Sequence, residues 1–126
     1  MSTGYGKILE SLQHSRFRSK FRLTRKDRMY VLDKGIPTIR RHAIEILSSR
    51  IAPRFPKNDG RQTPMKGHPV FVAQHATATC CRGCIQKWHG IEKGRALTEQ
   101  EVDFLADLIM AWIKRELIAC CTPIVG

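Results

Sequence analysis

The chain has 126 residues, of which 42% are hydrophobic and 26% charged, and its formal net charge at pH 7 is +11. This length suits one compact domain with its own core and is too short for two, so we expect a single domain over residues 1–126. The longest strongly apolar stretch, residues 104–113, includes an aspartate and is too short to cross a bilayer, which argues against a membrane-spanning protein. The sequence starts without the apolar stretch of a secretory signal. We therefore expect a cytoplasmic protein with reduced thiols.

The positive charge is concentrated in the first half of the chain. Residues 1–57 hold 14 Lys or Arg against 4 Asp or Glu, whereas residues 58–126 hold 8 against 7. Such a one-sided positive field attracts polyanions whatever their sequence. Nucleic acid, either DNA or RNA, is therefore the partner we expect first.

The first quarter of the chain predicts two elements after an uncertain start. Residues 1–15 carry a short apolar pattern that fits either a short helix or a flexible arm. In residues 16–23, basic and apolar side chains alternate with a period of two, which predicts an extended segment with one cationic and one apolar side. Thr24 and Asp27 form an acidic variant of the capping box, which predicts a helix through Leu32 that Gly35 ends.

The middle of the chain predicts a helix followed by a long loop. A helix beginning at Pro37 or Thr38 has apolar residues at helical spacing and ends before Pro53. Residues 53–67 are crowded with Pro, Gly, Asn and Asp, which predicts an irregular loop; loops of this length in small domains usually have a function or are disordered. Pro69 then suits the first turn of a short helix that runs toward Ala78.

The last predicted helix is the most apolar one. Thr98 and Glu101 form a capping box, and Leu97 can pack on Val102 as a hydrophobic staple. A wide apolar stripe follows, made of Val102, Leu105, Ala106, Ile109, Trp112, Ile113 and Leu117. The expected fold is mainly α: a small single-domain helical fold with a long irregular loop and a Cys/His metal-binding knuckle.

The knuckle lies in residues 68–90, which contain three of the five cysteines and three of the five histidines. Cys81, Cys84 and His89 follow a C-x2-C-x4-H spacing, which is typical of half a zinc site. His75 is our expected fourth ligand, with Cys80 as the alternative. The same cysteines can instead be buried reduced thiols, or a redox or nucleophilic centre.

A closed set of four protein ligands is typical of a structural metal, so we expect one structural zinc ion per chain. The alternative is a small metal-dependent nuclease, in which His75 or His68 acts as base and Asp59 as a metal ligand. The sequence departs from the pattern of such nucleases, because the chain lacks a second C-x2-C.

The segment 16–28 carries the densest positive charge. Its phenylalanines, Phe17 and Phe21, could stack on exposed bases. An acidic partner protein, bound by a phage or bacterial regulatory protein, is the alternative to nucleic acid. We predict that phosphate contacts are made by Arg16, Arg18, Lys20, Arg22, Arg25, Lys26 and Arg28.

Several runs of the sequence together resemble a known family. They are FRSKFRL at 17–23, KD at 26–27, KG at 34–35, HA at 42–43, RIAP at 50–53 and NDGRQTPMKGHPVFVAQHATATCCRGCIQKWHGI at 58–91. From Phe17 to Trp112 the chain resembles a bacterial and phage family catalogued as domain of unknown function 4186. The resemblance implies that residues 58–91 are the signature of a shared site, and it implies no particular activity.

Overall fold

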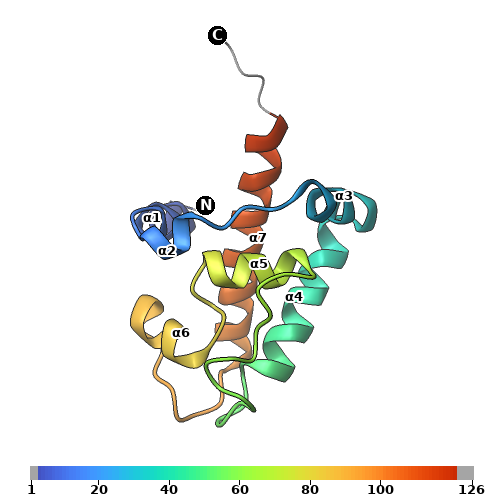
Figure 1. Cartoon of the computed structure of the whole chain (residues 1–126). Coiled ribbons are helices and arrows are strands. Elements are labelled where there is room, and N and C mark those ends of the chain that lie inside the picture. Colours follow the sequence, from blue (N-terminus) through green and yellow to red (C-terminus); the bar gives the residue numbers. More distant parts are fainter. Residues whose placement is uncertain (1–2, 122–126) are drawn as a thin grey trace.

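The computed structural model describes residues 3–121, with side chains from Tyr5 to Ala119. In this part of the chain the structure is helical and has no strand (Figure 1), as predicted for a mainly α fold. Its helices are α1 (Thr3–Gln13), α2 (Arg16–Ser19), α3 (Arg25–Lys34), α4 (Ile36–Arg50), α5 (Pro69–Ala76), α6 (Arg82–His89) and α7 (Glu99–Cys121).

The start of α3 confirms the predicted capping box. The Thr24 hydroxyl accepts a hydrogen bond from the Asp27 N–H at 3.0 Å, and the Asp27 carboxylate accepts one from the Thr24 N–H at 3.1 Å. The helix runs two residues past Leu32 and ends at Gly35, whose φ of 90° lies in the region that favours glycine. Helix α4 begins directly after this glycine, with Pro37 in its first turn.

Helix α7 is the centre of the fold. Thr98 and Glu101 exchange the two hydrogen bonds of a capping box at its start, as predicted. In Figure 1, α7 runs behind α5 with α4 beside it. The buried core joins the apolar stripe of α7 to one face each of α4 and α5, and its fully buried members include Ile39, Ala43, Leu47, Val70, Ala73, Leu105, Ile109 and Ile113.

The N-terminal quarter differs from the prediction in one respect. Residues 16–19 form the short helix α2 and not an extended strand, because the Ser15 hydroxyl accepts a hydrogen bond from the Arg18 N–H and caps a helical turn. Residues 20–24 then run without regular structure to α3. The preceding segment is the helix α1, which buries Leu9 and Leu12 in the core.

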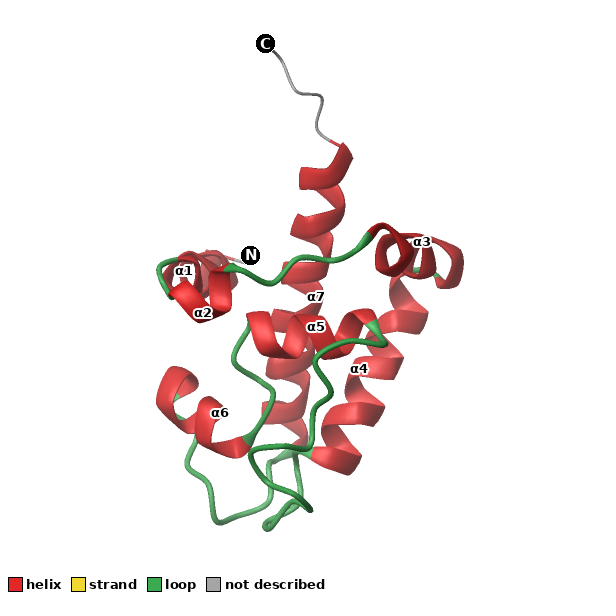
Figure 2. Ribbon diagram, in the orientation of Figure 1, coloured by secondary structure: helices red, strands yellow, loops and turns green. Residues whose placement is uncertain are grey.

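The predicted irregular loop is present between α4 and α5. Figure 2 shows it in green at the lower end of the molecule, beside the segment that joins α6 to α7. Asn58 and Gly60 have φ angles of 58° and 97°, so the loop turns sharply there. No helix in the described part of the chain has the length and the apolar character that crossing a bilayer requires.

Candidate metal centre

Three cysteines lie together at the start of α6. One ligand atom from each of Cys80, Cys81 and Cys84 lies within 4.8 Å of the other two. The Sγ atoms of Cys81 and Cys84 are 3.3 Å apart. Cys80 is buried, and the other two thiols are partly accessible. Sulfur donors this close together can hold a metal ion.

Local backbone structure places these sulfurs. Cys81 is the N-cap of α6, and its Sγ accepts a hydrogen bond from the Cys84 N–H at 3.4 Å. The sulfur thus takes the role that a side-chain oxygen has in an ordinary N-cap. Cys80 follows a tight turn at Ala78, whose φ is 59°. The Thr63 hydroxyl donates to the Cys80 carbonyl at 2.8 Å and so attaches the long loop to the centre.

A buried arginine contacts the cysteines. Arg18 is only 8% exposed, and its guanidinium donates hydrogen bonds to the Cys84 Sγ at 3.0 Å, to the Cys80 Sγ at 3.6 Å and to the His75 carbonyl at 2.7 Å. In the described part of the chain, no carboxylate forms an ion pair with it. The phosphate contact of Arg18 stays a prediction; in this structure its side chain points into the protein and contacts the cysteines.

The pKa values of Cys80 and Cys84 are shifted in opposite directions. The hydrogen bonds that Cys84 accepts from Cys80, Cys81 and Arg18 lower its pKa well below the ordinary value of a thiol. The pKa of Cys80 is raised by its hydrogen bonds with Cys81 and Cys84 and by burial. Cys84 is consequently the sulfur that carries negative charge first, and it is the sulfur nearest the guanidinium.

The two histidines of the predicted ligand set face backbone carbonyls. The Nε2 of His89 lies 2.8 Å from the Thr77 carbonyl oxygen, and the Nε2 of His75 lies 3.2 Å and 3.1 Å from those of Thr63 and Pro64. A carbonyl oxygen only accepts, so each Nε2 donates a proton, and in a neutral ring the lone pair is then on Nδ1.

The cysteine group therefore differs from the predicted set of Cys81, Cys84, His89 and His75. It includes Cys80, which was the alternative ligand, and neither histidine joins it within 4.8 Å. Helix α5 directs the His75 ring toward the loop carbonyls and against Phe21, whose ring centroid is 5.4 Å away.

Neither His68 nor Asp59, both from the nuclease alternative, belongs to the group of ligand atoms that lie within 4.8 Å of one another. His68 caps α5: its Nδ1 accepts from the Val70 N–H at 3.0 Å, and its Nε2 lies 3.2 Å from the Nδ1 of His42. Burial, followed by the charge of His42, lowers the pKa of His68. Asp59 accepts hydrogen bonds from the Arg82 N–H and the Gln62 amide. Asp59 and His68 are thus engaged in local turn and cap contacts.

Arg82 is a structural residue that the sequence did not indicate. It is fully buried, and its guanidinium donates to the carbonyls of Ile51, Pro53 and Glu92 at 3.4, 3.2 and 2.9 Å. These carbonyls belong to two separate loops, which the side chain joins beneath the start of α6. An arginine in the run CCRGC gives no sign of burial, because its partners are backbone atoms far away in sequence.

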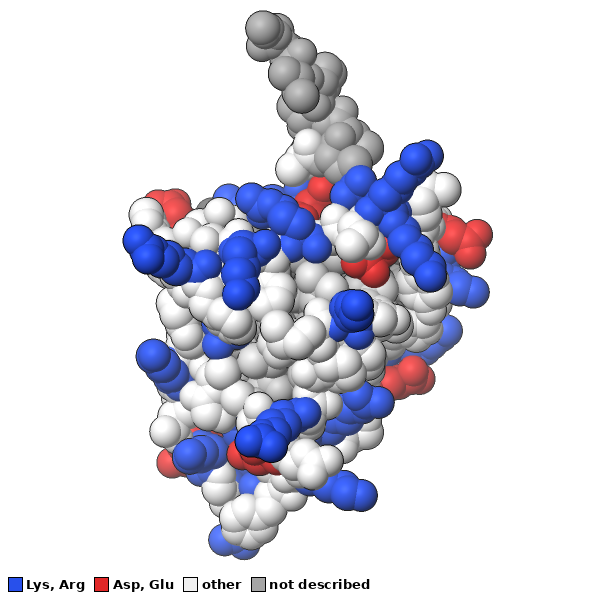
Figure 3. All heavy atoms as spheres, in the orientation of Figure 1, with Lys and Arg blue, Asp and Glu red and all other residues white. Residues whose placement is uncertain are grey.

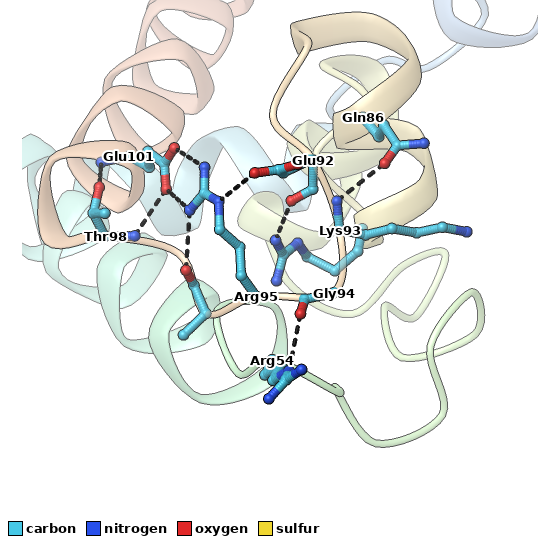
Figure 4. A network of polar contacts seen from close by, with 10 residues as sticks. Arg54, Gln86, Glu92, Lys93, Gly94, Arg95, Thr98 and Glu101 are labelled. Atoms are coloured by element: carbon cyan, nitrogen blue, oxygen red, sulfur yellow. Dashed lines mark hydrogen bonds and ion pairs between the residues drawn. The ribbon is translucent and has the colours of Figure 1, made fainter.

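A second polar network fixes the segment between α6 and α7. Figure 4 shows Arg95 in a bidentate contact with Glu101, with nitrogen–oxygen distances of 2.8 and 2.7 Å. In the same view Arg54 donates to the Gly94 carbonyl at 2.9 Å. The long loop and the segment before α7 are thereby held together.

Most of the other basic residues of segment 16–28 face solvent. Arg22 pairs with Glu116 at 3.2 Å, and the half-buried Arg28 donates to the Leu23 carbonyl. Figure 3 shows Lys and Arg side chains from the upper edge of this face, where α1, α2 and α3 lie in Figure 1, down to its lower end. The exposed members of the segment are Arg16, Lys20, Arg22, Arg25 and Lys26.

The two phenylalanines of this segment have different environments. Phe17 is 43% exposed, and Lys20 lies over its ring at 4.8 Å. Phe21 is partly buried between Phe17 and His75. Of this pair, Phe17 is therefore the one with substantial ring surface open to solvent.

Comparison with the models of protein families finds a match over most of the chain. The model of a family described as Domain of unknown function (DUF4186) matches residues 6–114. The match includes α2, the cysteine centre and most of α7. No solved structure matches the chain.

Proposed function

The chain belongs to the family described as Domain of unknown function (DUF4186), and we propose that it is a zinc-stabilised protein that binds nucleic acid through phosphate contacts. Cys80, Cys81 and Cys84 supply three thiolates. The His89 ring, which lies outside this group in the structure, approaches it on metal binding and supplies the fourth ligand through Nδ1. One zinc ion per chain has a structural role in this proposal.

The observation that carries the zinc proposal is the buried guanidinium of Arg18. A buried cation needs a countercharge, and the described partners of Arg18 are two cysteine sulfurs and a carbonyl oxygen. Three thiolates around a divalent ion leave one net negative charge. The guanidinium offsets this charge, so the cluster of three thiolates, the divalent ion and Arg18 is neutral as a whole.

His89 fits the fourth position better than His75. Burial lowers the pKa of His89, so the ring is neutral at pH 7 and able to bind a metal. Its Nε2–H donates to a backbone carbonyl, which is the usual contact of a metal-binding histidine. The charges of Cys84 and Arg18 also act on this ring, which indicates that it lies near the centre.

The metal centre also supports the proposed nucleic-acid surface. Arg18 lies in the same short helix as Arg16, and its bonds to Cys80 and Cys84 attach that helix to the start of α6. These bonds hold residues 16–28 against the protein through Arg18. The neighbouring basic side chains stay exposed to solvent, namely Arg16, Lys20, Arg25 and Lys26. Fixed cations of one sign attract phosphate with a strength that falls steeply with salt.

Two measurements on tag-free protein test the proposal. Plasma mass spectrometry should find about one zinc per chain in the wild type and in His14→Ala, an exposed control, and little in Cys84→Ser. Zinc-free wild-type protein with a native melting temperature would contradict the metal part.

Fluorescence anisotropy with labelled oligonucleotides tests the second part. Arg25→Gln combined with Lys26→Gln should weaken binding and reduce the salt slope by up to about 2 units, at roughly 0.9 per lost duplex phosphate contact. Lys114→Gln, an exposed lysine on α7, serves as the matched control. Equal affinity and slope in the double variant and the control would contradict phosphate binding by this segment.

A further inference from the structure

The long loop between α4 and α5 exposes an aromatic ring. Phe55 is 76% exposed, more than any other large hydrophobic side chain in the described part of the chain. Phe55 belongs neither to the core nor to the partly buried side chains that pack against it. A ring this open is available to stack on a flat ligand.

One positive charge lies against the ring, and other basic residues are exposed in the same loop and in the segment before α7. The Arg54 guanidinium carbon lies 5.0 Å from the Phe55 ring centroid. Arg54 is also held by its hydrogen bond to the Gly94 carbonyl, which Figure 4 shows. Lys57 and Arg61 are exposed on the same loop, and Lys93 is exposed next to Gly94. The nearby acid, Asp59, is already an acceptor for Arg82 and Gln62.

A cleft of about 310 Å³ lies beside the ring. Its walls are formed by three basic residues, one acid, two apolar residues and a glycine: Arg54, Arg82, Lys93, Asp59, Phe55, Pro56 and Gly94. This volume is near the lower limit of small-molecule sites, so it suits a ligand of roughly one nucleotide. Apolar walls from Phe55 and Pro56 fit a base, and Arg54 and Lys93 fit its phosphate.

We propose that this cleft receives one unpaired nucleotide of a single-stranded nucleic acid, with the base stacked on Phe55 and the phosphate facing Arg54 and Lys93. The inference rests on the proposed nucleic-acid function and specifies its substrate class. Bases in a duplex are stacked on each other and cannot reach the ring, so the site favours single strands. Because every base has a flat face, stacking adds little sequence preference.

The test compares Phe55→Ala with wild type by fluorescence anisotropy, using labelled single-stranded dT20 and a 20-base-pair duplex of mixed sequence. Stacking on one aromatic ring is worth ~1–3 kcal/mol per base, so affinity for dT20 should fall at least about fivefold. Affinity for the duplex should stay unchanged. Phe55→Trp should restore binding to dT20, since it keeps an aromatic face.

Met65→Ala is the matched control, because Met65 is 52% exposed on the same loop. It should bind both probes like wild type. If the wild type binds both probes and Phe55→Ala binds dT20 equally well, the stacking site is contradicted while the proposed function stands. If the wild type binds neither probe at low salt, both proposals fail. Circular dichroism and melting curves should show the native fold in all variants, because both side chains lie outside the core.

Discussion

The guanidinium of Arg18 lies 3.0 Å from the Sγ of Cys84, although the two residues are 66 positions apart in the sequence. This contact joins the basic N-terminal segment to the cysteine centre. The centre can thus influence the surface that carries the exposed cations, since loss of the thiolates would remove the partners of a buried charge.

Arg18→Met tests this link. Methionine keeps an unbranched side chain in place of arginine but removes the charge and the hydrogen-bond donors. We therefore expect zinc affinity to fall ~10–100-fold, as for other contacts that support metal ligands. Competition with a coloured chelator measures the affinity. Arg16→Met, an exposed neighbour, should leave it unchanged. Equal zinc affinity in both variants would show that Arg18 does not support the centre.

The two histidines should respond differently to substitution. In our proposal His89→Ala removes a ligand and increases the zinc dissociation rate at least tenfold, whereas His75→Ala leaves zinc bound. His75→Ala should instead loosen the carbonyls of Thr63 and Pro64, which the ring now contacts. Zinc release and hydrogen exchange of residues 61–67 separate the two effects. Faster zinc release in His75→Ala than in His89→Ala would reverse the assignment.

Arg82 should be essential to the fold. The planar guanidinium of Arg82 donates to three backbone carbonyls. In Arg82→Lys a compact ammonium takes its place and cannot reach all three, so some of these buried acceptors lose their donor. Each unsatisfied acceptor costs about 1–3 kcal/mol, and we expect a loss of ~2–4 kcal/mol in the free energy of unfolding. Urea denaturation measures this loss, with the exposed Lys87→Arg on the same helix as the control. A loss below ~0.5 kcal/mol in the free energy of unfolding would contradict this structural role of Arg82.

The Arg95–Glu101 contact predicts a pH effect on stability. The bond from Arg95 holds the pKa of Glu101 at about 2, against an ordinary value of 4.5. The unfolded chain therefore takes up a proton on Glu101 before the folded chain does. The stabilisation by this carboxylate is complete above pH 4.5 and is lost as the pH falls toward 2.

Glu101→Gln measures that contribution. The difference between its urea midpoint and that of the wild type should be constant from pH 7 to 5 and should shrink below pH 4.5. Glu99→Gln, an exposed acid in the same helical turn, should show a much smaller difference. A difference for Glu101→Gln that stays constant down to pH 2.5 would contradict the lowered pKa.

The sequence by itself determined the helical elements of α3, α4 and α7, the capping boxes of α3 and α7 and the long loop. These features depend on neighbouring residues: the Thr24–Asp27 and Thr98–Glu101 boxes close over three positions, and Gly35 ends a helix through its own backbone freedom. The position of the cysteines was also visible, because C-x2-C spacing at a helix start is a local pattern.

Only the tertiary structure decided which side chains meet at the centre. The alternation of charges in residues 16–23 predicted that Arg18 faces outward with its neighbours, but the helical turn capped by Ser15 directs it onto the cysteines. Cys80 joins the group, and His75 faces loop carbonyls instead. Arg82 likewise finds its partners in two distant loops. Burial of a charge depends on countercharges and carbonyls supplied by remote segments, and these come together only when the chain folds.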